Sequence, residues 1–309
     1  MSSAGARAQA RAGRCGVTIT ADTVSEDSVI AEPGVYDIPE WLYHSDPVPG
    51  GSLSSSGARK LLPPSCPAKF RYEADHPAPP TKYMEKGTAA HQLVLGTGAP
   101  IVVVEASDWK TKAAQAQRDE ARAAGAVPLL PADYQQVQEM ALALRLHPVA
   151  SVLFDPGRGG LPEQSLFWED REFGVWRRAR PDWLPAPGPG RMIIPDYKTI
   201  GSADLDTIRK HVSNFGYHCQ ADYYCAGAQA LGIDEDPAFL FVFQETSPPY
   251  LITVVQLDED AMWAGRQANR EALERYRDCM QAGVWPGYTD EIQLVSLPPW
   301  ARRRYTESI

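Results

Sequence analysis

The sequence has no long apolar run and few cysteines. No stretch approaches the roughly 20 consecutive apolar residues of a membrane-spanning helix, and the N-terminus lacks the apolar segment of a secretory signal. The five cysteines form no Cys-x-x-Cys pair, and their odd number is typical of reduced thiols rather than of a disulfide framework. We therefore expect a cytoplasmic protein that does not contact membranes.

Positive charge is also scarce. The 30 basic residues are outnumbered by 39 acidic ones, and the net charge of −9 excludes a surface coated in basic residues. Any contact with nucleic acid must therefore come from a local groove. Some basic residues either lead DNA toward such a groove or are ordinary solvated charges; they are Arg177, Arg178, Arg180, Lys210 and residues 302–304.

Composition divides the 309 residues into one large unit and two tails. The first sixteen residues are rich in Arg and Ala and contain no acid. This favours a disordered tail over an organellar transit peptide or a DNA-contacting arm. We expect the tail to cover residues 1–33, a single catalytic domain to cover 34–300, and a basic C-terminal tail to cover 301–309.

Helical signals dominate the first half of the chain and the end of the second half. Serine precedes a short helix in SLSSSGARKLL, and Gly96 ends a run of helix formers that has His91 at its centre. The other expected helices cover residues 110–125, 132–147, 215–231 and 258–282, with a strand at 101–106 and a β-hairpin formed by FLFVFQE and YLITVVQL. The pattern predicts a mixed α/β protein.

Residues 163–198 alternate short β-branched or aromatic segments with turns, which predicts a β-meander. The PAPGPG stretch within it is rich in proline and glycine, so we expect it to be a loop that joins two neighbouring strands. On this interpretation Asp182 lies near the end of one strand, and Asp196 lies near the end of the next.

Asp196 and Lys198 are two residues apart on a predicted strand, so both project from one face and Tyr197 from the other. Phosphodiester hydrolysis needs such a pair. A carboxylate holds the divalent ion that activates water, and a fixed ammonium orients that water or offsets charge in the transition state. Taken alone, however, Asp-x-Lys is more often a surface ion pair.

Two further acids strengthen this site. Asp182 precedes Asp196 by fourteen residues across the proposed hairpin, where both carboxylates form an oxygen site suited to Mg²⁺, or to Mn²⁺ as a substitute. Glu163 supplies a third carboxylate or orients a ligand. Taken singly, Asp182 is more simply explained by an ion pair with a nearby arginine, and Glu163 by exposure to solvent.

His91, Gln220 and Tyr224 complete the set of candidates. The imidazole of His91 is a credible additional metal ligand, although a single histidine is more often structural. Gln220 and Tyr224 are four residues apart and share one face of a helix. There an amide and a phenol either bind a phosphate or a base edge or simply pack.

These residues occur in the order His91, Glu163, Asp182, Asp196-Tyr-Lys198 and Gln220-x-x-x-Tyr224. This order resembles the RecB-like branch of the PD-(D/E)xK nucleases. The segments SLSSSGARKLLPPSCPAKFRYE and PTKYMEKGTAAHQLVLG resemble in particular the RecE (exonuclease VIII) type of phage and prophage origin. The resemblance covers roughly residues 36–260.

The resemblance implies a mixed sheet flanked by helices with a restriction-endonuclease-like core. By position it gives His91, Asp182 and Asp196 metal-site roles, makes Lys198 the catalytic lysine and makes Glu163 an accessory acid. Gln220 and Tyr224 match the helix motif that follows the core, where we expect them to bind substrate. The implied activity is a Mg²⁺-dependent exonuclease that degrades duplex DNA from an end.

The direction expected from the resemblance is 5′ to 3′. The single strand so produced would serve homologous recombination, with a single-strand annealing recombinase as partner, and members of the family often form closed oligomers. Two alternatives remain at this stage: a RecB-like nuclease that prefers single-stranded or flap DNA, and a catalytically silent protein that binds DNA ends. Silent relatives are expected to lose the Asp or Lys residues, and this sequence retains them.

Overall fold

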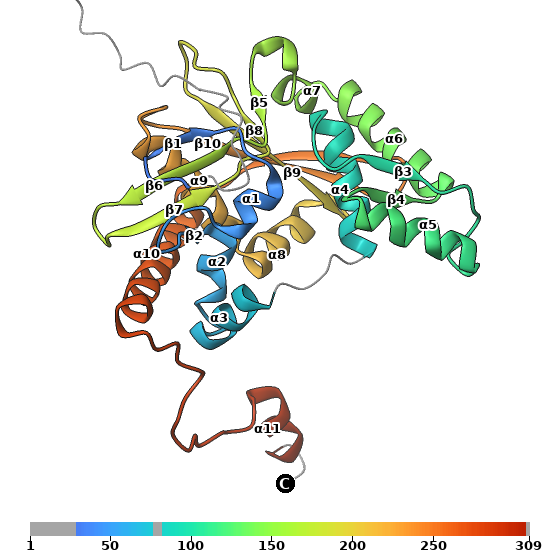
Figure 1. Cartoon of the computed structure of the whole chain (residues 1–309). Helices are drawn as coiled ribbons and strands as arrows, with labels where there is room; N and C mark the ends of the chain where they lie inside the picture. Colours follow the sequence, from blue (N-terminus) through green and yellow to red (C-terminus); the bar gives the residue numbers. More distant parts are fainter. Residues whose placement is uncertain (1–28, 77–81, 307–309) are drawn as a thin grey trace, which may run out of the picture.

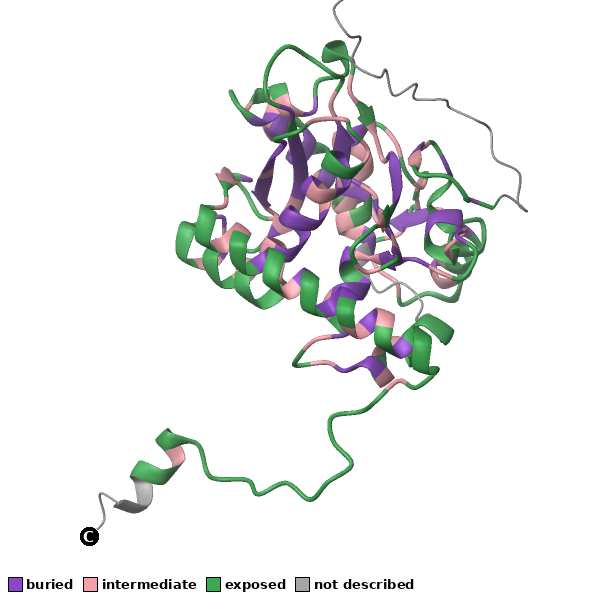
Figure 2. Ribbon diagram, turned by 90° about the vertical axis from the view of Figure 1, so that its left-hand side faces the viewer, coloured by how far each residue is buried: buried purple, intermediate pink, exposed green. Residues whose placement is uncertain are grey.

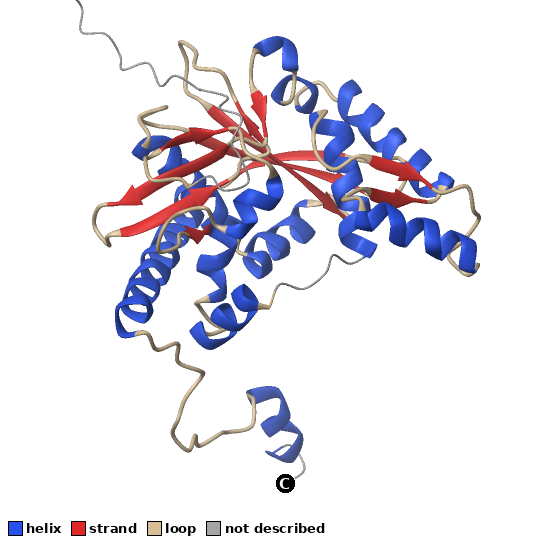
Figure 3. Ribbon diagram, viewed as in Figure 1, coloured by secondary structure: helices blue, strands red, loops and turns tan. Residues whose placement is uncertain are grey.

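The computed structural model describes residues 29–76 and 82–306. Most of the tail expected at residues 1–33, and the last three residues of the expected C-terminal tail, lie outside this part. The described chain is a mixed α/β protein in which helices surround the strands (Figure 3). This confirms the fold class predicted from the sequence.

Two sheets form the centre of the molecule (Figure 1). The first has the order β1-β6-β7-β2, and the second has the order β11-β10-β9 with β9 at its edge. The first sheet comprises β1 (Gly34–Tyr36), β6 (Ser165–Asp170), β7 (Val175–Ala179) and β2 (Leu53–Ser54). The second comprises β11 (Ile252–Gln256), β10 (Ala238–Glu245) and β9 (Ile193–Ile200). Two short pairs join β3 (Ile101–Val103) to β4 (Val127–Leu129), and β5 (Leu161–Pro162) to β8 (Trp183–Leu184).

Helices cover both faces of the second sheet. On one face lie α4 (Lys82–Leu95) and α6 (Pro131–Leu146). On the other, α9 (Tyr217–Ala230) contacts β10, β6 and β7, and α10 (Glu259–Ala282) packs outside α9. The remaining helices are α1 (Glu40–Ser45), α2 (Ser55–Lys60), α3 (Pro67–Asp75), α5 (Lys112–Ala123), α7 (Ala150–Leu153), α8 (Leu205–Phe215), α11 (Pro299–Thr306) and the 3-10 helix η1 (Pro156–Arg158).

Alternation along the central strands separates two cores. Phe241 and Phe243 of β10 face the core shared with α9, whereas Val242 faces the core shared with α4 and α6. In the parallel pairing with β9, Tyr197 lies opposite Val242 and joins the same core. The central strands are therefore buried on both faces (Figure 2), as expected for parallel strands. The prediction that Tyr197 points away from Asp196 is confirmed.

Local signals placed the helix boundaries well. The Ser54 side chain accepts a hydrogen bond from Gly57 N at 3.1 Å at the start of α2, and Asp258 caps α10 in the same way through Ala261 N. The contact of α10 with α9 also needs a glycine. A Cβ atom at Gly265 would lie 2.2 Å from the backbone oxygen of His218, so only glycine permits this approach.

The predicted meander over residues 163–198 is wrong beyond its first two strands. β6 and β7 pair as expected, but the chain then leaves the first sheet. Pro181 lacks an N–H and restricts the residue before it, so the expected continuous strand breaks between Ala179 and Trp183. The PAPGPG loop joins β8 to β9, which belong to different sheets, so the predicted hairpin is also wrong. Asp196 lies in the middle of β9 rather than near its end.

After Gly283 the chain first packs against α3, where Trp285 stacks on Phe70 and Ala68 N donates to Pro286 O. It then runs as an exposed segment to α11, which stands apart from the main body (Figures 1 and 2). The segment carries several exposed apolar side chains, among them Ile292, Leu294 and Val295. Among the helices of the described residues, none combines the length and apolar character required to cross a membrane.

Candidate active site

Three side chains from three separate elements meet beside the edge strand β9. His91 comes from α4, Glu163 from the turn before β6, and Asp182 from the turn before β8. His91 Nε2 lies 2.8 Å from Asp182 Oδ2, and His91 Nδ1 lies 3.4 Å from Glu163 Oε1. One ligand atom from each residue falls within 4.8 Å of the other two. The structure thus brings together two carboxylates and an imidazole from distant parts of the sequence.

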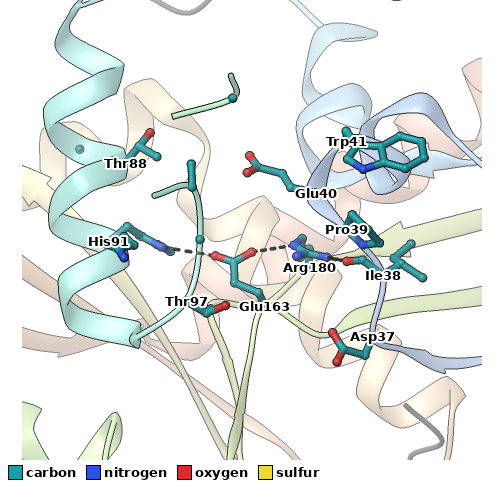
Figure 4. Close-up of a pocket in the computed structure, with 15 residues that line it drawn as sticks. Asp37, Ile38, Pro39, Glu40, Trp41, Thr88, His91, Thr97, Glu163 and Arg180 are labelled. Atoms are coloured by element: carbon teal, nitrogen blue, oxygen red, sulfur yellow. Dashed lines mark hydrogen bonds and ion pairs between the residues drawn. The ribbon is translucent and has the colours of Figure 1, made fainter. Parts of the chain in front are cut away.

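The backbone at Glu163 adopts a left-handed conformation, with φ of +54°. This conformation costs a residue with a Cβ atom roughly 1–2 kcal/mol, so surrounding contacts must maintain it. Glu163 N donates a hydrogen bond to Asp182 O at 3.1 Å, and Arg180 Nε donates to Glu163 Oε2 at 2.6 Å. The carboxylate is consequently held between Arg180 and His91 (Figure 4).

Asp182 also closes the open edge of β9. An edge strand has backbone N–H groups that no strand pairs with, and Tyr197 N donates to Asp182 Oδ2 at 2.7 Å. Asp182 is 8% exposed. The same carboxylate oxygen therefore contacts His91 and fixes the turn before β8 against β9, although the two strands do not pair.

Asp196 and Lys198 project from one face of β9, as their spacing predicts. Lys198 Nζ lies 2.6 Å from Asp196 Oδ2, and Gln220 Nε2 of α9 donates to Asp196 Oδ1 at 2.6 Å. Asp196 is only 1% exposed. It is therefore not a surface ion pair, because both carboxylate oxygens are held inside the protein.

Gln220 and Tyr224 share the face of α9 that points toward the site. Gln220 contacts Asp196, and Tyr224 Oη donates to Arg180 O at 3.3 Å. In this structure both side chains contact the protein itself and position site residues. Their predicted substrate-binding role stays a prediction.

Burial disfavours charge on each of these groups, and neighbouring charges decide the direction of each pKa shift. Burial alone would lower the pKa of His91, but Asp182 and Glu163 outweigh it and raise this pKa to about 10. Burial also opposes ionisation of Asp182, but the charge and hydrogen bond of His91, the charge of Lys198 and the hydrogen bond from Tyr197 together outweigh burial and lower the Asp182 pKa.

On the β9 side, burial and then the charge of Asp182 raise the pKa of Asp196 to about 6. Burial alone would lower the pKa of Lys198, but the charges of Asp196 and Asp182, with the hydrogen bond to Asp196, together outweigh burial and raise this pKa. Asp182 and Asp196 therefore repel each other through a poorly solvated region. A cation bound between them would be stabilised by both charges.

Arg180 is the site residue that sequence reasoning did not assign. The sequence predicts that the run Arg177-Arg178-Ala-Arg180 leads DNA or is solvated charge. Solvated charge is wrong for all three arginines, because each is largely buried and paired with a carboxylate. Arg180 also lines the cavity beside the site, so a role in leading DNA stays a prediction for it. Arg177 pairs with Asp170 at 3.0 Å and Arg178 with Asp46 at 2.7 Å, and each is largely buried.

The alternative explanation of Asp182, an ion pair with Arg178 or Arg180, is wrong, because Arg178 pairs with Asp46 and Arg180 with Glu163. Alternation with Val175 and Ala179 indicates an inward direction for Arg177, whereas Arg180 follows the end of this strand. Asp46, the partner of Arg178, is distant in the sequence, but Asp170 and Glu163 precede their arginines by only 7 and 17 residues.

The donor set fits a hard divalent ion. Mg²⁺ and Mn²⁺ prefer carboxylate oxygens, and imidazole is an accepted additional ligand for Mn²⁺ and other transition metals. His91, Glu163 and Asp182 supply this set, with Asp196 on the adjoining strand face. A cavity of about 970 Å³ reaches His91 and Glu163 from solvent and is large enough for a nucleotide.

Comparisons with known proteins identify the family and the fold. The family model described as "PDDEXK-like domain of unknown function (DUF3799)" matches residues 54–298. A structure described as a "Putative exonuclease" from Eubacterium rectale aligns with a TM-score of 0.58 at 12% identity, over 86% of this chain and 98% of that chain. At this identity the likeness shows a shared fold.

A phage-related exonuclease from Haemophilus somnus also aligns, over 75% of this chain and 96% of that chain at 14% identity. Its TM-score of 0.27 is too low to support a structural argument. A comparison with curated proteins finds no match.

Proposed function

Because this chain belongs to the PDDEXK-like family DUF3799, we propose that it is a metal-dependent exodeoxyribonuclease. The observation that carries the proposal is the convergence of His91, Glu163 and Asp182 within 4.8 Å, beside a strand that presents Asp196 and Lys198. Phosphodiester hydrolysis requires these components: oxygen ligands for a divalent ion and a fixed cation at the reacting phosphate.

Each residue has a distinct role in this proposal. Asp182, His91 and Asp196 would hold Mg²⁺, with Mn²⁺ as a substitute, and Glu163 would complete or orient this set. When bound, the ion supplies Lewis-acid polarisation of the phosphate and lowers the pKa of water. His91 must lose its proton before it can act as a ligand.

Lys198 would act on the reacting phosphate rather than on the ion. The ammonium is held at 2.6 Å from Asp196, and the charge of Asp196 keeps its pKa raised, so it stays protonated near the phosphate. In that position it orients the attacking water or offsets the charge that develops in the transition state. Gln220 fixes the other oxygen of Asp196 and so positions the pair.

The finer assignment rests on the resemblance to the RecE type. We propose that the substrate is a duplex DNA end, that degradation runs 5′ to 3′, and that the remaining strand is passed to a single-strand annealing recombinase. These properties depend on the path of DNA over the surface as well as on the metal site.

A single digestion experiment tests both levels of the proposal. One linear duplex is labelled at its 5′ ends in one preparation and at its 3′ ends in another, and each is incubated with Mg²⁺ or with EDTA. We expect labelled mononucleotides to be released first from the 5′ ends, only with Mg²⁺, while a closed circular duplex remains intact.

The matched variants are Asp182→Asn in the site and Asp206→Asn on α8, where the side chain is 82% exposed. We expect the first to lose activity and the second to retain it. Early release from the 3′ ends would reverse the proposed polarity. Cleavage restricted to single-stranded or flap substrates would favour the RecB-like alternative. Binding of ends without cleavage in Mg²⁺ or Mn²⁺ would indicate a silent end-binding protein.

A further inference from the structure

The cavity beside the candidate site has two unlike walls. One wall is formed by α4 and the turn after it, and it carries His91 and Thr88. The facing wall is the segment of residues 37–41 that leads into α1 (Figure 4). The cavity has a volume of about 970 Å³, at the upper end of the range for small-molecule sites. A whole nucleotide therefore fits beside the three metal-ligand candidates.

The charges of the 37–41 wall disfavour a phosphate. Asp37 and Glu40 line it, and a hydrogen bond with His44 is the main cause that lowers the pKa of Glu40 and keeps it ionised. The nearby cation Arg180 is already occupied, since it donates to Glu163 Oε2 at 2.6 Å and to Ile38 O at 2.9 Å. A DNA backbone is therefore repelled here, whereas an uncharged base is not.

Trp41 provides an aromatic surface on this same wall. Trp41 is 53% exposed, although it lines the cavity. In Figure 4, Trp41 and Glu40 lie across the cavity from His91 and Thr88. A single exposed tryptophan is not unusual on a protein surface. Trp263 on α10 is 63% exposed, but it does not line this cavity. The distinguishing feature of Trp41 is its place beside the candidate metal ligands.

We propose that this cavity binds one nucleobase of the substrate and that Trp41 is its stacking surface. The inference rests on the proposed nuclease function and adds the form in which DNA reaches the site. A base enclosed between two walls of protein is separated from its complement, so the nucleotide beside the cleaved bond is unpaired when it is cut. Carboxylates at the wall are available to accept hydrogen bonds from exocyclic amino groups.

The test combines a change in the protein with a change in the DNA. Binding of a duplex end is measured with Ca²⁺ in place of Mg²⁺ to suppress turnover, for the wild type and for Trp41→Ala, Trp41→Phe and Trp263→Ala. The DNA series consists of the intact duplex and duplexes that lack a single base at the first, second or third nucleotide of either strand.

Loss of one stacked base corresponds to roughly a 5-fold to 150-fold change in affinity. We therefore expect Trp41→Ala to bind the intact end about tenfold more weakly, Trp41→Phe to retain most of the affinity, and Trp263→Ala to match the wild type. At one position of the DNA series, removal of the base should lower the affinity of the wild type to that of Trp41→Ala. The contact that the variant lacks is then missing in both proteins.

The inference is overturned if Trp41→Ala binds every DNA end with the affinity of the wild type. It is also overturned if the loss of affinity relative to the wild type is the same on all DNAs of the series. The same proteins are assayed for cleavage of the intact duplex in Mg²⁺, and Trp41→Phe controls for folding. A wild type that does not cleave refutes the proposed function. A wild type that cleaves, together with a Trp41→Ala protein that is unchanged in binding and cleavage, refutes only the base site.

Discussion

Asp182 and Asp196 are the two carboxylates at the centre of the candidate site, and their surroundings differ. Asp182 lies in a turn, contacts the cation His91 at 2.8 Å and has a lowered pKa. Asp196 lies inside β9, contacts Lys198 at 2.6 Å and has a pKa raised to about 6 by burial and by Asp182. Two carboxylates of the same chemistry are therefore prepared for different tasks.

The difference indicates which of the two carboxylates is accessible to an ion that enters from the cavity. Asp182 shares its surroundings with His91 and Glu163, whose side chains are 26% and 23% exposed and are reached from the cavity. Asp196 is enclosed by Lys198 and Gln220. The Asp182 side thus resembles an accessible ion-binding position, whereas Asp196 adjoins it from a buried strand and also holds Lys198.

Asp182→Asn is the substitution for which we expect the largest effect. The amide retains the volume and an acceptor for Tyr197 N, but it removes the charge beside His91. We expect cleavage to fall by more than about a thousandfold, and the thermal stabilisation by Mn²⁺ to disappear. Quantitative end-release assays and melting curves with and without Mn²⁺ check this. Persistent Mn²⁺ stabilisation would remove Asp182 from the proposed ligands.

Asp196→Asn tests whether the second carboxylate also holds the ion. We expect cleavage to fall about a thousandfold and Mn²⁺ stabilisation to weaken without vanishing, because His91 and Asp182 remain. The same assays apply, with Asp206→Asn as the control. An Asp196→Asn protein that binds Mn²⁺ like the wild type would restrict Asp196 to positioning Lys198.

Lys198→Ala separates chemistry from metal binding. The ammonium acts on the attacking water or on developing charge, so its loss should lower cleavage about a hundredfold. Mn²⁺ stabilisation and Ca²⁺-supported DNA binding should remain measurable. Lys112→Ala on the exposed face of α5 is the matched control. Near-normal cleavage by a folded Lys198→Ala protein would refute the role given to this lysine.

The smallest expected effect is that of Gln220→Leu. Gln220 orients Asp196 through a 2.6 Å hydrogen bond and does not contact the proposed ion, so we expect about a tenfold loss of cleavage. Leucine keeps a similar volume in the buried face of α9. A Gln220→Leu protein with unchanged cleavage rate but weakened DNA binding would instead support the substrate-binding role expected from the sequence.

The sequence by itself determined the features that depend on near neighbours along the chain. The two-residue spacing placed Asp196 and Lys198 on one face of a strand, and the four-residue spacing placed Gln220 and Tyr224 on one face of a helix. The order of these residues, together with the two flanking motifs, was sufficient for the correct superfamily and fold class.

Only the tertiary structure decided which distant groups meet. The break at Pro181 separates β8 from β7, and β8 and β9 belong to different sheets. Asp182 therefore reaches β9 through its carboxylate and the N–H of Tyr197 rather than through a hairpin. The left-handed backbone at Glu163 and its contact with Arg180 likewise depend on packing. Periodicity fixes the direction of a side chain from local geometry, whereas its partner is chosen by burial and charge among residues far apart in the sequence.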